Sequence, residues 1–128
     1  MKSYNKVTLL GHVVMQPEIK LVPGESDGPR TCSLAVATDN EWLDVQTGEP
    51  KKSVDFHRCI AWNELADKCT STLTKGALVL IEGRLTNRAY EGKNQVMHYI
   101  TEIVLEQVIL MPKPKEDALL STSKPFTL

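Results

Sequence analysis

The chain has 128 residues, of which 41% are hydrophobic and 24% charged, and its formal net charge at pH 7 is −1. These values predict one soluble globular domain with a modest core. The near-neutral charge excludes a strongly basic protein, so any nucleic-acid binding would depend on where the cations lie. Three cysteines without a CxxC spacing, no apolar run of membrane length and no signal-peptide pattern predict a cytoplasmic protein with reduced thiols.

The beginning of the chain alternates in the way that β-strands do. Apolar residues in 6–14 predict a strand, and Gly11 inside it predicts a bulge or a bend. Pro17 makes the continuation over 16–22 an edge strand or a sharply turned piece. Prolines, glycines and short polar residues predict a long polar loop over 23–30.

The second strand, predicted over 31–38, has one face of small side chains. Its two faces carry Cys32, Leu34 and Val36 on one side and Ser33, Ala35 and Ala37 on the other. The small residues leave room for another molecule to approach. Residues 39–53 predict a long hairpin, because they contain the turn signal Thr47-Gly48.

An arginine lies between aromatic residues in 54–62, the third predicted strand. Alternation places Phe56, Arg58, Ile60 and Trp62 on one face and His57, Cys59 and Ala61 on the other. A core face rarely carries an unpaired arginine, and a solvated face rarely carries two large aromatics. The pattern is typical of a surface that stacks nucleobases and holds phosphates.

After this strand the apolar spacing becomes helical. Leu65, Ala66, Cys69 and Leu73 fall on one helical face, Asn63 is expected to cap the helix and Gly76 to end it. The next strand, predicted over 77–90, repeats the earlier pattern. Its expected inward residues are Val79, Ile81, Gly83 and Leu85, and its outward residues are Glu82, Arg84, Thr86, Arg88 and Tyr90.

The end of the chain predicts one more strand and a tail. Residues 91–95 predict a turn, and 96–111 a strand expected to be buried on both faces over the run Ile103, Val104, Leu105, Val108, Ile109 and Leu110. Residues 112–128 predict a short tail beyond a domain of residues 1–111. Five strands with one helix between the third and fourth is the order of the OB-fold, an all-β, partly open barrel.

The candidate site for a single nucleic-acid strand combines aromatic rings with cations. The predicted stacking residues are Trp42, Phe56, Trp62 and Tyr90. The predicted phosphate contacts are Arg58, Arg84, Arg88, Lys51, Lys52 and Lys93. Each stacked base contributes roughly 1–3 kcal/mol, and the cations make binding salt-dependent. The alternative is that the aromatics fill the barrel or an oligomer interface, which is the preferred interpretation for Tyr4 and Tyr99.

The sequence does not predict a metal site or an enzyme. His57 and Cys59 share a strand face, but structural zinc sites need four ligands at recognisable spacing. Asp55 and His57 have no nucleophile or second carboxylate beside them in a recognisable arrangement. We therefore expect no cofactor, and assign His57 and Cys59 to packing or to a subunit contact.

Several segments together carry a resemblance over about Asn5 to Met111. They are Asn5-Lys6-Val7-Thr8-Leu9-Leu10-Gly11-His12, Pro17-Glu18, Ala35-Val36-Ala37-Thr38, Thr47-Gly48-Glu49, Phe56-His57-Arg58, Leu65-Ala66, Lys75-Gly76 and Ile81-Glu82-Gly83-Arg84-Leu85. In their order and spacing the chain resembles the bacterial-type single-stranded DNA-binding protein family. The resemblance implies an OB-fold homotetramer around which single-stranded DNA wraps, without strong sequence preference, in replication, recombination and repair.

The resemblance also implies which aromatics stack, namely the same four residues. Phe56 and Tyr90 stand where many members have tryptophan, and Trp62 where many have phenylalanine; each exchange keeps an aromatic face. Two segments depart from the family pattern. The loop 23–30 is longer, and Pro125-Phe126 is neither terminal nor preceded by an acidic run. In the family an acidic tip ending in Pro-Phe recruits replication and repair proteins, and this role does not carry over.

Two alternatives remain open at this point. One is a primosome-type OB module whose main task is protein contact, with weak strand binding. The other is a small metal-dependent nuclease on the same barrel.

Overall fold

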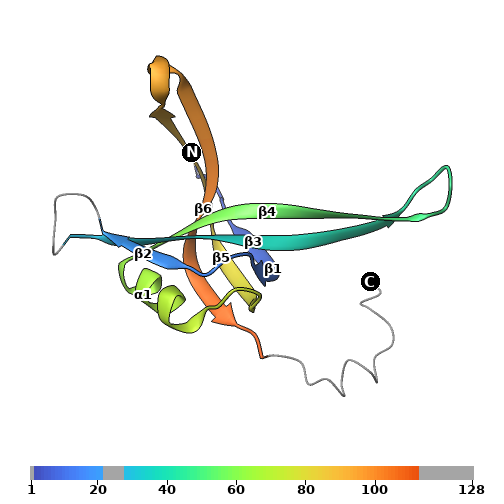
Figure 1. The fold of residues 1–128 in the computed structure, drawn as a ribbon, viewed down its shortest axis with the longest axis horizontal. Coiled ribbons are helices and arrows are strands. Elements are labelled where there is room, and N and C mark those ends of the chain that lie inside the picture. The colour runs from blue at the N-terminus through green and yellow to red at the C-terminus, as the bar shows by residue number, and fades with distance from the viewer. Residues whose placement is uncertain (1, 22–27, 113–128) are drawn as a thin grey trace.

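The computed structural model describes residues 2–21 and 28–112. Its elements are β1 (Val7–Val13), β2 (Glu18–Leu21), β3 (Arg30–Leu43), β4 (Pro50–Trp62), α1 (Asn63–Thr72), β5 (Leu78–Glu91), the short 3-10 helix η1 (Lys93–Gln95) and β6 (Met97–Leu110). In this part of the chain the strands form one sheet in the order β1-β5-β6-β4-β3-β2, and an additional β1–β3 pairing closes it (Figure 1). The predicted OB-fold is confirmed.

The barrel closes where β1 changes partner. Residues 7–12 pair with β5, whereas His12 and Val13 pair with Ala37 and Val36 of β3. Gly11 lies at this change, and a Cβ there would collide with the carbonyl oxygen of Ala37. The β1–β5 register runs through Gly11 without a shift, so the predicted bulge is absent there. The absence of a side chain is instead what allows the backbones of β1 and β3 to approach.

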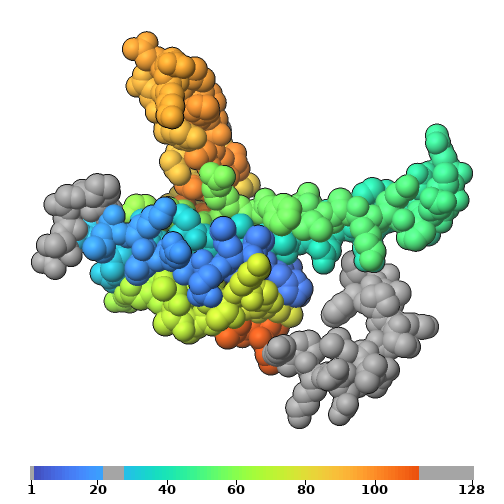
Figure 2. All heavy atoms as spheres, viewed as in Figure 1, coloured from blue at the N-terminus to red at the C-terminus, as the bar shows by residue number. Residues whose placement is uncertain are grey.

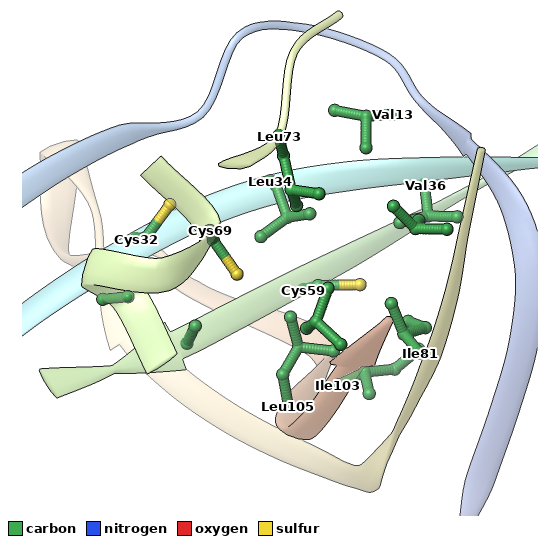
Figure 3. Packing of buried hydrophobic residues seen from close by; sticks show 14 residues of the cluster. Val13, Cys32, Leu34, Val36, Cys59, Cys69, Leu73, Ile81, Ile103 and Leu105 are labelled. Carbon is green, nitrogen blue, oxygen red and sulfur yellow. The ribbon is translucent and has the colours of Figure 1, made fainter. Parts of the chain in front are cut away.

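Apolar side chains from the inner faces of the strands and from α1 form the core (Figure 3). Its fully buried members include Val36 of β3, Cys59 of β4 and Cys69 of α1. Burial raises the pKa of the Cys59 thiol to about 12 and that of Cys69 to about 11. These thiols are therefore protonated at neutral pH and act as small apolar groups.

Two hairpins project from the barrel as arms (Figures 1 and 2). The β3–β4 arm comprises residues 39–54, and the β5–β6 arm comprises residues 85–102. β4 pairs with β6 only at Cys59 and Ile60. Beyond the barrel, therefore, the two strands of each arm pair only with each other. The predicted turn at Thr47-Gly48 is confirmed, with Gly48 at φ +71°, but the paired strands are longer than expected.

Three features of the chain order differ from the predictions. The continuation over 16–22 contains a separate strand, β2, so the helix lies between β4 and β5. Asn63 does not cap α1, because Trp62 occupies the N-cap position and Asn63 Oδ1 accepts a hydrogen bond from the Arg30 N–H. Gly76 does not end α1, because the helix stops at Thr72. The Gly76 N–H instead donates a hydrogen bond to the Val13 carbonyl in the turn before β5.

Three apolar residues expected to be buried are exposed: Leu85, Ile109 and Leu110. The β5–β6 register shifts between Glu82 and Gly83. Leu85 follows this irregularity and lies where β5 leaves the barrel, so there is no core beneath it. Ile109 alternates outward from buried Val108, and Leu110 lines an open hollow at the end of the barrel.

Parts of three predicted segments lie outside the described residues, namely residue 22 of the piece 16–22, residues 23–27 of the loop and residues 113–128 of the tail. Within the described part of the chain, no helix is long and apolar enough to cross a membrane.

Candidate nucleic-acid interface

The outer face of β4 carries three of the predicted site residues, namely Phe56, Arg58 and Trp62. Cys59 and Ala61 are fully buried, whereas Phe56 is 67% exposed and Trp62 is 44% exposed. The alternation predicted for 54–62 is therefore confirmed, and Phe56 and Trp62 are not core residues of this chain. The exposed aromatic area gives a strand of bases a surface on which to stack.

Phe56 and Arg58 border an open hollow of about 360 Å³ where the two arms leave the barrel. Across β3, Ala37 lies opposite Phe56 and Ala35 lies opposite Arg58. The remaining lining residues are Met15, Ser33, Leu34, Ala35, Arg88 and Glu102. The face of small side chains predicted for 31–38 thus lies beside the aromatic residue.

A charged pair joins the strands of the β5–β6 arm at the same hollow. Arg88 Nε donates a hydrogen bond of 2.8 Å to Glu102 Oε1. The Glu102 side chain is 7% exposed and that of Arg88 is 52% exposed. Arg58, in contrast, has no ion-pair partner among residues 2–21 and 28–112. The structure therefore brings two of the predicted cations together and adds an acid that the sequence did not indicate.

Tyr90 has an aromatic partner that the sequence analysis missed. Its ring stacks on that of His98, which lies directly opposite on β6. The turn predicted over 91–95 was the only signal that could have placed His98 near Tyr90. Alternation puts Arg84, Arg88 and Tyr90 on one face of β5, as predicted.

Trp42, Lys51 and Lys52 lie on the β3–β4 arm, and the register places the two lysines on opposite faces. Trp42 lies opposite Lys51, whereas Lys52 lies opposite Glu41. Alternation therefore puts Trp42 and Lys51 on the face opposite to Phe56. The hollow does not include Trp42, so a strand that contacted both aromatics would have to pass around the arm.

The lysines of this arm have acidic neighbours. Lys52 Nζ lies 3.8 Å from Glu41, and Lys51 Nζ lies 4.0 Å from Glu49. Exposed pairs of this kind contribute about 0–1 kcal/mol, so these lysines can exchange partners with phosphates at little cost. Arg84 and Lys93 have no ion-pair partner among the described residues, and Lys93 lies in η1 at the tip of the other arm.

His57, considered above for metal or acid–base chemistry, lies beside Thr38 of the neighbouring strand. His57 Nε2 and Thr38 Oγ1 share a hydrogen bond of 2.8 Å. Among the described residues there is no group of three or more His, Cys, Asp or Glu side chains that could hold a metal ion.

The closed barrel, the helix α1 and the exposed face of aromatic and arginine side chains define an OB-fold protein suited to binding an oligonucleotide. Residues 4–111 match the model of the Single-strand binding protein family, and the chain belongs to this family. Among solved structures, the chain is similar to the SSB of Plasmodium falciparum, which was solved in complex with ssDNA. The two chains are 32% identical, the match covers 88% of this chain and 98% of that chain, and the TM-score is 0.78.

Proposed function

We propose that this protein binds single-stranded DNA, without strong sequence preference, through the faces of the two arms and the hollow between them. The observation that carries the proposal is the Phe56 ring, exposed beside Arg58 at the point where both arms leave the barrel. Membership of the single-strand binding protein family and the likeness to a structure solved with single-stranded DNA support it.

The mechanism combines stacking with local charge. Bases stack on Phe56, Trp62, Tyr90 and, around the β3–β4 arm, Trp42, each contributing roughly 1–3 kcal/mol. Phosphates contact Arg58, Arg84, Arg88, Lys51, Lys52 and Lys93. The net charge of −1 does not oppose this mechanism, because screening confines charge interactions to about 10 Å at moderate salt.

In the cell the protein would protect exposed strands during replication, recombination and repair, as a binder rather than an enzyme. Binding only unpaired DNA shifts the duplex equilibrium toward that state and removes hairpins by mass action. We further propose a homotetramer in the cytoplasm, at the nucleoid. Exposed apolar residues such as Leu10 and Leu85 offer surface that subunit contacts would cover, and native mass measurement tests the assembly.

A titration with oligo-thymidine, in the absence of metal, tests the function. Tryptophan fluorescence should fall sharply, binding should weaken as salt rises, and duplex DNA should have little effect. An unchanged signal with tight binding to a replication protein would favour the primosome-type module. Strand cleavage on addition of magnesium or manganese would favour the nuclease.

The salt dependence can be assigned to the site with one variant and a matched control. Arg58→Ala should reduce the slope of log K against log salt by about 0.7, the value for one phosphate contact with a single strand. Lys75→Ala removes one exposed positive charge at a different hollow, which is lined by His12, Lys75 and Leu110 and shares no residue with the hollow at Phe56, and it should leave the slope unchanged. Equal effects of the two variants would show that net charge, rather than this face, sets the affinity.

A further inference from the structure

Glu102 is a buried acid in the face proposed to bind a polyanion. Its side chain is 7% exposed, and it lines the hollow together with Phe56, Arg58 and Arg88. A phosphate placed there would be repelled by the carboxylate at short range. The part of the hollow beside Glu102 therefore fits an uncharged part of the strand better than the backbone, while Arg58 in the same hollow remains available to a phosphate.

The Glu102 carboxylate has unused capacity to accept hydrogen bonds. Arg88 Nε donates to Oε1, and no other donor to this carboxylate is found among the described residues. A carboxylate has about four acceptor positions. Oε2 is not a fully buried atom without a partner, and Glu102 is one of the residues that line the hollow.

The chemistry of DNA limits what could donate to Glu102. Phosphodiesters carry no proton at neutral pH, and deoxyribose within a strand has no free hydroxyl group. The remaining donors are the base N–H groups. Adenine, cytosine and guanine each have an amino group beside a ring acceptor or a second N–H, whereas the single N–H of thymine lies between two carbonyl oxygens.

The Arg88–Glu102 pair presents a donor beside an acceptor, as an amino-bearing base requires. We propose that the hollow seats one base stacked on Phe56, with its amino group donating to Glu102, and that this position favours adenine, cytosine or guanine over thymine. The volume of about 360 Å³ lies within the usual range of small-molecule sites, roughly 300–1,000 Å³. The inference rests on the proposed function and adds a base preference at one position.

The test compares two oligonucleotides of equal length, one of 5-methylcytosine and one of thymine. These bases share ring size and methyl group and differ at the edge that would face Glu102. Glu102→Gln keeps the volume, but its amide can turn to present either a donor or an acceptor. We expect this variant to change the ratio of the two affinities by about fivefold or more, in favour of thymine.

The ratio is decisive, because other positions also contribute to absolute affinity. The control is Glu106→Gln, which makes the same change at an exposed position of β6 outside the hollow and should leave the ratio unchanged. If Glu102→Gln shifts both affinities by the same factor, Glu102 acts only through its charge or through Arg88, and the base preference is wrong. If the wild-type protein binds neither oligonucleotide, the proposed function itself fails.

A second measurement does not depend on the folding of a variant. The wild-type protein is titrated with oligonucleotides of cytosine and of 2-pyrimidinone, which lacks the amino group. Weaker binding of 2-pyrimidinone by several-fold supports the amino contact, and equal binding overturns it.

Discussion

Tyr90 on β5 stacks on His98 on β6, with ring centroids 5.1 Å apart and planes inclined by 22°. The two rings form one platform near the tip of the β5–β6 arm. A Cβ at Gly92 would collide with the His98 ring, so the glycine leaves the space that this ring occupies. Aromatic pairs of this kind contribute about 0.5–1.5 kcal/mol beyond the area they bury, which helps to hold Tyr90 in its orientation.

Loss of the Tyr90 ring should weaken binding of oligo-thymidine. We expect Tyr90→Ala to cost roughly 1–3 kcal/mol, and His98→Ala to cost less because the Tyr90 ring remains. Equilibrium titration at one salt concentration measures both. Tyr99→Ala is the control, since Tyr99 lies opposite Ala89 on the other face of the same arm and should have little effect. A loss at Tyr99 as large as that at Tyr90 would mean that the arm binds through its other face.

Trp62→Ala should weaken DNA binding and leave the fold intact. Trp62 is exposed, and it provides the N-cap of α1 without a side-chain hydrogen bond, so the helix does not need the indole. The expected cost to binding is roughly 1–3 kcal/mol. A Trp42→Phe background leaves Trp62 as the sole tryptophan, so quenching by DNA then reports on this ring. Unfolding of Trp62→Ala, with normal binding by its folded fraction, would instead identify Trp62 as a core residue.

Gly11→Ala should destabilise the barrel. The added methyl group would collide with the Ala37 carbonyl where β1 passes from β5 to β3. Such overpacking costs about 1–3 kcal/mol, measurable by urea unfolding. Thr8→Ala, at an exposed position of the same strand, should stay within about 0.5 kcal/mol of the wild type. Equal stability of Gly11→Ala and the wild type would show that β1 at Gly11 leaves room for a methyl group beside the Ala37 carbonyl.

Stability should fall above pH 9 because of the buried thiols. An exposed thiol ionises near its usual pKa of 9.0, whereas burial raises the pKa of Cys59 to about 12. Between these values the unfolded chain loses the proton first. The stabilisation of the folded state by the protonated, buried Cys59 thiol is therefore complete below pH 9, and it disappears as the pH rises toward 12. Urea unfolding at increasing pH should show a shallower decline for Cys59→Ala than for the wild type. Parallel declines would assign the effect to other groups.

Residues 54–62 show how much local sequence determines. Side-chain alternation follows from the covalent geometry of an extended chain, so the exposure of Phe56 and the burial of Cys59 could be predicted without any knowledge of the partner strands. The same holds for the buried face of α1, which follows from helical periodicity. The element order then limited the fold to a five-stranded barrel of the OB type, and this was sufficient to group the aromatic residues as a candidate site.

Contacts between distant strands were decided only by the tertiary structure. The hollow joins Phe56 and Arg58 of β4 to Arg88 of β5 and Glu102 of β6, and this arrangement depends on the register of three strands and on closure of the barrel. Nothing near Glu102 in the sequence distinguishes it from a solvated acid. Leu85 is exposed for a related reason, since burial depends on which strands continue beside it. The sequence alone determined which sides of β4 and α1 face outward, while long-range pairing determined which outward side chains meet.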